Sequence, residues 1–96
     1  MIYNNVMLKV KNAEDVETVA ELLSEQARLS SEEPGCARFE VYHSQADHLQ
    51  FLLVEQWSTE GDLARHKEAK AFIELYLPKV IPLVERVPHL SHLVWP

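Results

Sequence analysis

Apolar and polar residues alternate along the first part of the chain. Val6, Leu8 and Val10 fall on one side of an extended segment over residues 2–11, and mostly polar residues fall on the other. A period of two residues is typical of a half-buried β-strand. From residue 13 to residue 30 the apolar positions instead recur at steps of three and four, which predicts an amphipathic helix.

The dipeptide Pro34-Gly35 divides this helix from two more predicted strands. Pro34 cannot continue a helix, and Gly35 permits a turn with positive φ. Residues 37–43 and 49–57 both alternate, and the polar sequence SQADH between them predicts a hairpin. The second of these strands is apolar on both faces, with Leu49, Phe51, Leu53 and Trp57 on one side and Leu52 and Val54 on the other.

A second helix is predicted to follow this hairpin. Pro78 and Pro82 must bend or divide it, because proline lacks the amide that a helix interior uses. Pro88 is expected to separate it from a last short strand over residues 89–95. The predicted stripe of this helix comprises Leu63, His66, Ala69, Ile73 and Leu77.

The resulting order, strand-helix-strand-strand-helix-strand, is that of the ferredoxin-like split βαβ fold, an α+β class with a four-stranded antiparallel sheet. In this fold both helices cover one face of the sheet and leave the other face open. Apolar residues on that open face favour a partner, since burying one apolar side chain contributes roughly 1.5–3 kcal/mol. We therefore predict a single domain over residues 1–96 that pairs face to face as a homodimer.

Composition and charge narrow the choice of partners. The formal net charge is −6, and there is no basic cluster that would bind nucleic acid. The apolar runs are too short to cross a bilayer and the N-terminus has no secretory pattern, so we expect a cytoplasmic protein without a membrane partner. The five histidines show no zinc-site spacing, which predicts no metal, and the single cysteine, Cys36, is expected to be a packing residue.

Several ordered motifs resemble those of the antibiotic biosynthesis monooxygenase (ABM) domain family. They are EEPGCARFEVYHS, then FLLVEQWSTEGDLARHKEAKAFIEL with its Glu-x-Trp and a histidine in the helix, then a proline-bearing helix and a closing strand. The resemblance extends from Val6 to about Trp95. It implies a dimeric α+β barrel in which each subunit has an apolar pocket between its helices and its sheet.

The resemblance also implies an activity. Many members are thought to oxidise phenols or quinols with molecular oxygen and without a metal or flavin, whereas others degrade haem or isomerise a small phosphorylated ketone. In the haem-degrading members the helix carries a tryptophan and, ten positions later, the histidine that binds iron. His66 and Tyr76 occupy those places here, which argues against haem. The resemblance therefore implies a cofactor-independent monooxygenase acting on a small aromatic or quinol-type substrate.

The resemblance places a pocket histidine at His66. We expect this residue to project into the pocket as a base or as the hydrogen-bond partner of a substrate anion. The structural alternative is a buried histidine paired with a carbonyl or with Glu55, a residue that we otherwise expect to pair with Arg38 across the hairpin. Tyr76 is expected to orient a substrate oxygen, or else to be a core tyrosine with one hydrogen bond.

Two asparagines lie near the start of the first strand, where asparagine is disfavoured. The resemblance implies a ligand contact from one of them. Asn4 shares the predicted face of Val6 and Leu8, whereas Asn5 shares that of Met7, and the sequence keeps both as catalytic candidates. A frayed strand end is the structural alternative.

Four further residues are candidates for substrate contact. His43 ends an apolar strand face and lies either in the pocket or at the rim of the hairpin. Trp57 and Phe72 would form apolar pocket walls or fill the core, and Ile73 continues the predicted stripe of the second helix.

Two other functions remain open at this point. A non-redox isomerase of the same fold would need a histidine and a nearby acid, and a phosphorylated substrate would need cations, for which Lys67 and Lys70 are the candidates on the second helix. A dimer that binds a small apolar ligand without catalysis is the other alternative.

Overall fold

Four strands form one antiparallel sheet in the order β2-β3-β1-β4. The computed structural model describes all 96 residues. The arrangement is a ferredoxin-like α+β fold, which confirms the predicted fold class. Along the chain the elements are β1 (Ile2–Val10), η1 (Ala13–Asp15), α1 (Val16–Ser30), β2 (Cys36–His43), β3 (Gln50–Trp57), α2 (Glu60–His66), η2 (Ala71–Val80), η3 (Ile81–Leu83) and β4 (Val84–Ser91).

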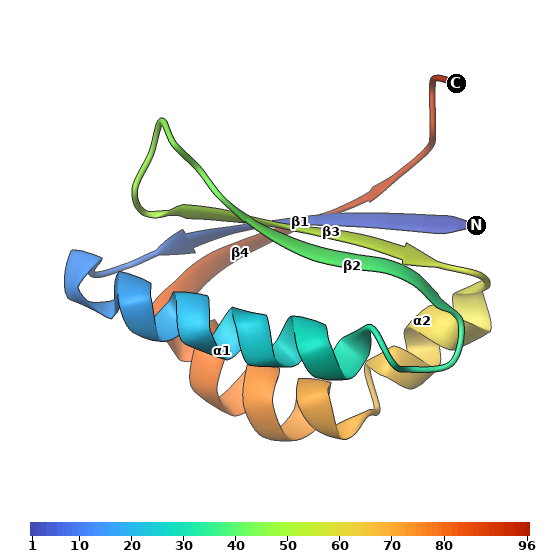
Figure 1. Cartoon of the computed structure of the whole chain (residues 1–96), viewed down its shortest axis with the longest axis horizontal. Coiled ribbons are helices and arrows are strands. Elements are labelled where there is room, and N and C mark those ends of the chain that lie inside the picture. The colour runs from blue at the N-terminus through green and yellow to red at the C-terminus, as the bar shows by residue number, and fades with distance from the viewer.

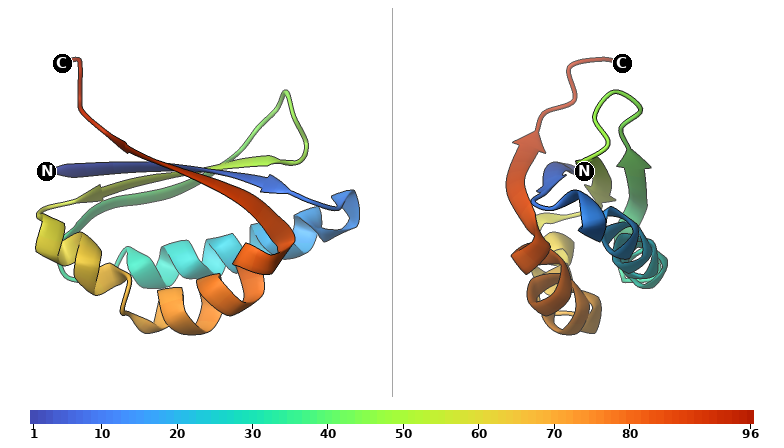
Figure 2. Two further views of the ribbon diagram at one scale, coloured as in Figure 1. Left: turned by 180° about the vertical axis from the view of Figure 1, so that it is seen from behind. Right: turned by 90° about the vertical axis from the view of Figure 1, so that its left-hand side faces the viewer.

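All helices lie on one face of the sheet and leave the other face open (Figure 1). The end-on view of Figure 2 shows α1 on the side of β2 and η2 on the side of β4. The core fills the space between these layers, as the alternation of residues 2–11 predicts. Val6, Leu8 and Val10 are at most 1% exposed, and they pack in one cluster with residues of α1, η2 and the other strands. None of the helices has the length and apolar character needed to cross a membrane.

Gly35 sets the approach of the α1–β2 turn to α2. Its φ is +79°, a conformation that costs other residues strain, and a Cβ added there would overlap the carboxyl group of Asp62. The Gly35 carbonyl also accepts a 2.8 Å hydrogen bond from the amide of Ser58. This turn therefore fixes Glu33, two residues earlier, against the side of α2.

The second predicted helix is divided in the structure. α2 ends at His66, and residues 71–80 then form the wider π-helix η2. A π-helix has i→i+5 hydrogen bonds, so its inward positions are spaced more widely than those of an α-helix. Ala71, Tyr76 and Val80 face inward as a result. The predicted stripe was wrong beyond the break, because Ile73 and Leu77 are 49% and 43% exposed.

The prediction for the last strand was also wrong. Pro88 lies inside β4 and is paired with Val6, and residues 92–96 lie beyond the strand, where the chain leaves the sheet (Figure 1). Proline is tolerated because β4 is an edge strand, in which half of the amides point away from the sheet and need no strand partner.

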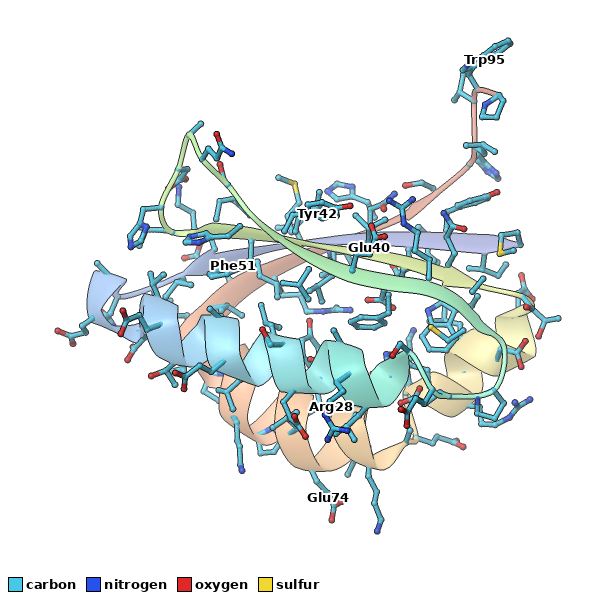
Figure 3. All side chains as sticks on the ribbon, in the orientation of Figure 1. Arg28, Glu40, Tyr42, Phe51, Glu74 and Trp95 are labelled. Atoms are coloured by element: carbon cyan, nitrogen blue, oxygen red, sulfur yellow. The ribbon has the colours of Figure 1, made fainter.

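An apolar row crosses the open face of the sheet. The strand register places Tyr42 opposite Leu52, Leu52 opposite Met7, and Met7 opposite Val87, so one side chain from each strand contributes. Tyr42, Met7 and Val87 are between 41% and 51% exposed. Figure 3 shows Tyr42 and Glu40 on this face, with Phe51 on the helix side of the sheet.

Candidate functional site

A cluster of polar side chains lies inside the otherwise apolar space between sheet and helices. Asn4 and Glu55 stand opposite each other on β1 and β3, and they are 5% and 4% exposed. Asn4 Nδ2 and Trp57 Nε1 both donate to Glu55 Oε1, over 3.4 and 3.0 Å. Buried polar groups are normally hydrogen-bonded in this way, so the cluster is a regular part of the packed core.

His66 joins this cluster from the end of α2. Its Nδ1 is 2.7 Å from Glu33 Oε1, and its Nε2 is 4.0 Å from Glu55 Oε1. A carboxylate can only accept hydrogen bonds, so Nδ1 carries a hydrogen and donates a hydrogen bond to Glu33. The imidazole is stacked on Trp57, with ring centroids 4.5 Å apart, and Phe72 meets it edge-on at 5.4 Å. These contacts fix both the tautomer and the orientation of the ring.

The charge of Glu55 is sensitive to its surroundings. Burial raises the pKa of this carboxyl, and the hydrogen bond from Trp57 and the charges of His66 and Arg86 oppose that shift only in part. A raised pKa means that Glu55 accepts a proton more readily than an exposed glutamate does. The site therefore contains a buried carboxyl whose neutral form its surroundings favour more than water would.

Tyr76 and Arg86 form a second polar pair beside the first. Arg86 Nε donates to the Tyr76 hydroxyl over 2.8 Å, while its guanidinium carbon lies 5.9 Å from the centre of the tyrosine ring. Burial raises the pKa of Tyr76 despite the arginine charge, so the phenol stays neutral and its own proton remains available to donate. Arg86 takes part in none of the ion pairs of the structure.

Two hollows border these groups. The β4 hollow, of about 320 Å³, has two cations and one amide among apolar side chains, and it is lined by Asn4, Leu63, Lys67, Arg86, Pro88 and Leu90. The Glu33 hollow, of about 360 Å³, lies on the other flank of α2 and is lined by Glu33, Pro34, Arg65, His66, Glu68 and Ala69. A third hollow of about 410 Å³ near the N-terminus shares Leu63 and Leu90 with the β4 hollow but contains none of the buried polar cluster.

The structure brings five of the predicted site residues together. Asn4 borders the β4 hollow, Trp57 and Phe72 hold the ring of His66, and Tyr76 holds Arg86. The position of His66 differs from the expectation: its ring is packed among aromatic side chains and reaches the Glu33 hollow, not a dry cavity under the sheet.

Three other candidates lie away from this group. Asn5 is on the open face, where its Nδ2 donates to Ser91 Oγ over 3.3 Å. His43 is exposed at the hairpin, stacked on Phe51 with its Nε2 2.7 Å from the His48 carbonyl, and Ile73 is on the outer side of η2. The expected pairing of Glu55 with Arg38 was wrong, because Glu55 faces the helices while Arg38 forms its ion pair with Glu40 on the open face.

Two residues of the site were missed by the sequence analysis. Arg86 lay outside the predicted last strand, although with Val84 and Pro88 it falls on the inward side of the strand that actually forms. Glu33 lay in a predicted turn, and only the approach of that turn to α2 brings it to His66.

Comparison with solved structures finds the same fold. A conserved protein of unknown function from Bacteroides thetaiotaomicron, described as a possible oxidoreductase, is 26% identical with a TM-score of 0.88 over 94% of each chain. A protein from Nitrosomonas europaea, provisionally named an antibiotic biosynthesis monooxygenase, is 23% identical with a TM-score of 0.85 over 97% of this chain and 99% of that one. A mutant of SnoaB, a cofactor-independent oxygenase from Streptomyces nogalater, is 12% identical with a TM-score of 0.86 over 99% of this chain and 94% of that one.

No curated protein matches the sequence. The sequence does match a protein family, described as antibiotic biosynthesis monooxygenase, over residues 1–76. This range holds Asn4, Glu33, Glu55, His66 and Tyr76 and ends before β4, which supplies Arg86. Because the match covers most of the chain and the fold agrees with it throughout, the protein belongs to the antibiotic biosynthesis monooxygenase family.

Proposed function

We propose that this protein is a cofactor-independent monooxygenase that oxidises a small phenol or quinol bound in the β4 hollow. The observation that carries the proposal is the lining of that hollow: Arg86 and Lys67, neither engaged in an ion pair, beside Asn4 and three apolar side chains. In a chain with a net charge of −6, two free cations at one small hollow favour a substrate that becomes an anion.

In this reaction the protein contributes substrate binding and electrostatic stabilisation, because the substrate itself reacts with oxygen. A phenolate is electron-rich and can pass one electron to molecular oxygen, after which the two radicals combine to form a carbon–oxygen bond. One oxygen atom stays in the product, and the other leaves as water with two hydrogens from the substrate. Arg86 and Lys67 stabilise the anion that starts this sequence, and the buried side chain of Leu63 provides an apolar wall for the ring.

Three buried residues behind the β4 hollow, Tyr76, Glu55 and His66, support the residues that line it. Tyr76 holds the guanidinium of Arg86 in place through its hydroxyl. Asn4 ties the wall of the hollow to Glu55, which lies next to His66. His66 therefore serves the substrate through Glu55 and not by direct contact, a role that differs from the one expected from the sequence.

Oxygen consumption tests this proposal. Metal-free protein should take up oxygen with at least one member of a panel of small quinols and phenols, in proportion to protein concentration and well above boiled protein. Uptake no faster than that of the boiled control with every substrate, or uptake that follows residual metal content instead of protein, would refute it.

An isomerase is a second candidate, which the pairing of Lys67 and Arg86 at one hollow favours. These cations would equally hold an anionic carbonyl compound while Glu55 moves a proton next to the carbonyl. Such a reaction exchanges substrate hydrogen with solvent deuterium and consumes no oxygen, so the same assay separates the two.

We also propose that the open face of the sheet binds a second copy of the chain. The row formed by Tyr42, Leu52, Met7 and Val87 is self-complementary under a two-fold axis, and its exposure in one chain is unfavourable. The helices and both hollows of the site lie on the opposite side of the sheet or at its β4 edge, so this pairing leaves the substrate entrance free.

A further inference from the structure

We propose that Glu55, His66 and Glu33 form a proton relay that carries the proton of the bound substrate from the β4 hollow to the Glu33 hollow. The proposal rests on the proposed function, because it concerns the proton that a phenol must lose before it reacts. It assigns roles to Glu55 and Glu33, two carboxyl groups that substrate binding alone does not require.

The contacts form a line through the core in which Asn4 stands between the β4 hollow and Glu55, and a 4.0 Å gap separates Glu55 from His66. Asn4 borders the β4 hollow and donates to Glu55 Oε1 over 3.4 Å. Glu55 Oε1 lies 4.0 Å from His66 Nε2, a separation that a small side-chain rotation closes. On the other side of the same ring, Nδ1 is 2.7 Å from Glu33 Oε1, and Glu33 borders the outer hollow. A buried imidazole thus connects one carboxyl of the interior with one at the surface.

The surrounding charges favour transfer in the outward direction. Arg86 and Lys67 stand at the inner end and stabilise the anion that the departing proton leaves behind. At the outer end Glu68 lines the same hollow as Glu33 and adds negative charge there, while Arg65 is engaged with Asp62 in a 3.0 Å ion pair. The proton therefore moves from a cationic hollow toward an acidic one.

Each step exchanges one bond to hydrogen for another. The O–H bond of the substrate breaks and its proton passes to the Glu55 carboxylate, whose raised pKa suits it as the acceptor. Glu55 passes a proton to His66 Nε2, and Nδ1 gives its proton to Glu33, which releases it to solvent. No electron moves. Later, the oxygen atom that leaves as water needs protons, and passage in the reverse direction supplies one and restores the starting tautomer of His66.

The burial of His66 limits how its ring nitrogens exchange protons with water. His66 is 3% exposed and packed against Trp57, Phe39 and Phe72, so solvent has little access to its ring except at the Glu33 hollow. Protons on such a ring exchange with water only through groups that contact it, and Glu33 is the contact that reaches the surface. The rate at which the ring N–H exchanges with water therefore reports whether Glu33 transfers protons.

The first test follows a proton without any oxidation. Wild-type protein is mixed rapidly with 4-nitrophenol, which does not react with oxygen, at a pH where the free phenol is mostly protonated. Absorbance then reports the phenolate and a pH indicator reports protons released to solvent. We expect both signals in one phase. Glu33→Gln should slow proton release about 10-fold or more with the Kd changed less than about two-fold, and Glu55→Gln, which keeps the acceptor oxygen for Trp57 and Asn4, should abolish it.

Glu32→Gln is the matched control, because Glu32 is the exposed neighbour of Glu33 and touches neither hollow. It should behave as the wild type does. Proton release at the wild-type rate in Glu33→Gln would overturn the relay and leave Glu33 as a residue that only positions His66.

The second test needs no ligand. Exchange of the His66 ring N–H with water, measured by ¹⁵N-edited NMR, should be fast in the wild type for so buried a ring and at least about 10-fold slower in Glu33→Gln. Slow exchange in the wild type would overturn the relay even if 4-nitrophenol fails to bind. Positive results in both tests together with a negative oxygen assay would refute the monooxygenase proposal alone.

Discussion

Replacing Arg86 by methionine should lower kcat/KM for oxygen consumption about 100-fold, which is the effect of removing one charge that stabilises a developing anion. Arg86 has the strongest position for this role, because it borders the β4 hollow, makes no ion pair and is oriented by the Tyr76 hydroxyl at 2.8 Å. Methionine keeps much of the length and apolar character of the side chain and removes the charge and the donors.

The matched control is Arg28→Met. Arg28 lies on the outer side of α1 and pairs with Glu25, away from both hollows (Figure 3). The same substitution there should leave kcat/KM within about two-fold of the wild-type value. Tyr76→Phe separates charge from position, since it keeps the guanidinium and removes its anchor, and we expect a fall of about 10-fold. Equal activity of the Arg86 and Arg28 variants, both folded by circular dichroism, would show that the β4 hollow is not where an anion forms.

With the proposed pairing of the open faces, the wild type should be a dimer at micromolar concentration and Met7→Lys should be a monomer. Met7 stands at the centre of the apolar row on the open face, between Leu52 and Val87. Two lysines brought together across a two-fold axis would be desolvated without partners, at a cost of several kcal/mol per charge. On the exposed face of a monomer, in contrast, lysine is well tolerated.

Sedimentation equilibrium or native mass spectrometry measures the outcome, since one chain has a mass of 11.1 kDa. Gln56→Lys is the control, because it adds the same charge to the same face, on β3 four residues from Leu52 and outside the row. It should remain dimeric. A wild-type protein that is monomeric under these conditions, or a Met7→Lys variant that still dimerises, would mean that the open face does not pair with itself.

The fold could be predicted because its signals are local. Alternation over residues 2–11, three- and four-residue steps over residues 13–30 and the Pro34-Gly35 turn each act within a few residues, and all of them correspond to elements of the structure. The error in the last strand has a non-local cause. Proline was taken to end an element at Pro88, whereas the edge position of that strand, a property of the whole sheet, makes proline acceptable there.

The site was predicted in part for a related reason. The alternation of apolar and polar residues indicates which faces of the elements point inward, and these faces carry Asn4, His66 and Tyr76. The register of the sheet then places Asn4, and not Asn5, on the inward face. Ile73 was misplaced because the helix break changes the periodicity from that point on. Glu33 and Arg86 depend on contacts between residues far apart in sequence, with 33 positions from Glu33 to His66 and 10 from Tyr76 to Arg86. Such contacts leave no local pattern.

The central claim is that substrate binds in the β4 hollow, and NMR with 1-naphthol, a small phenol, locates the ligand directly. On titration, the largest shift changes should fall on the Arg86 Nε–H and the Asn4 side-chain amide, which border that hollow and not the one near the N-terminus. The methyl groups of Met7 and Val87 on the open face should change little. Saturable shifts confined to the open face, to the hairpin around His43 or to the hollow near the N-terminus would contradict the account.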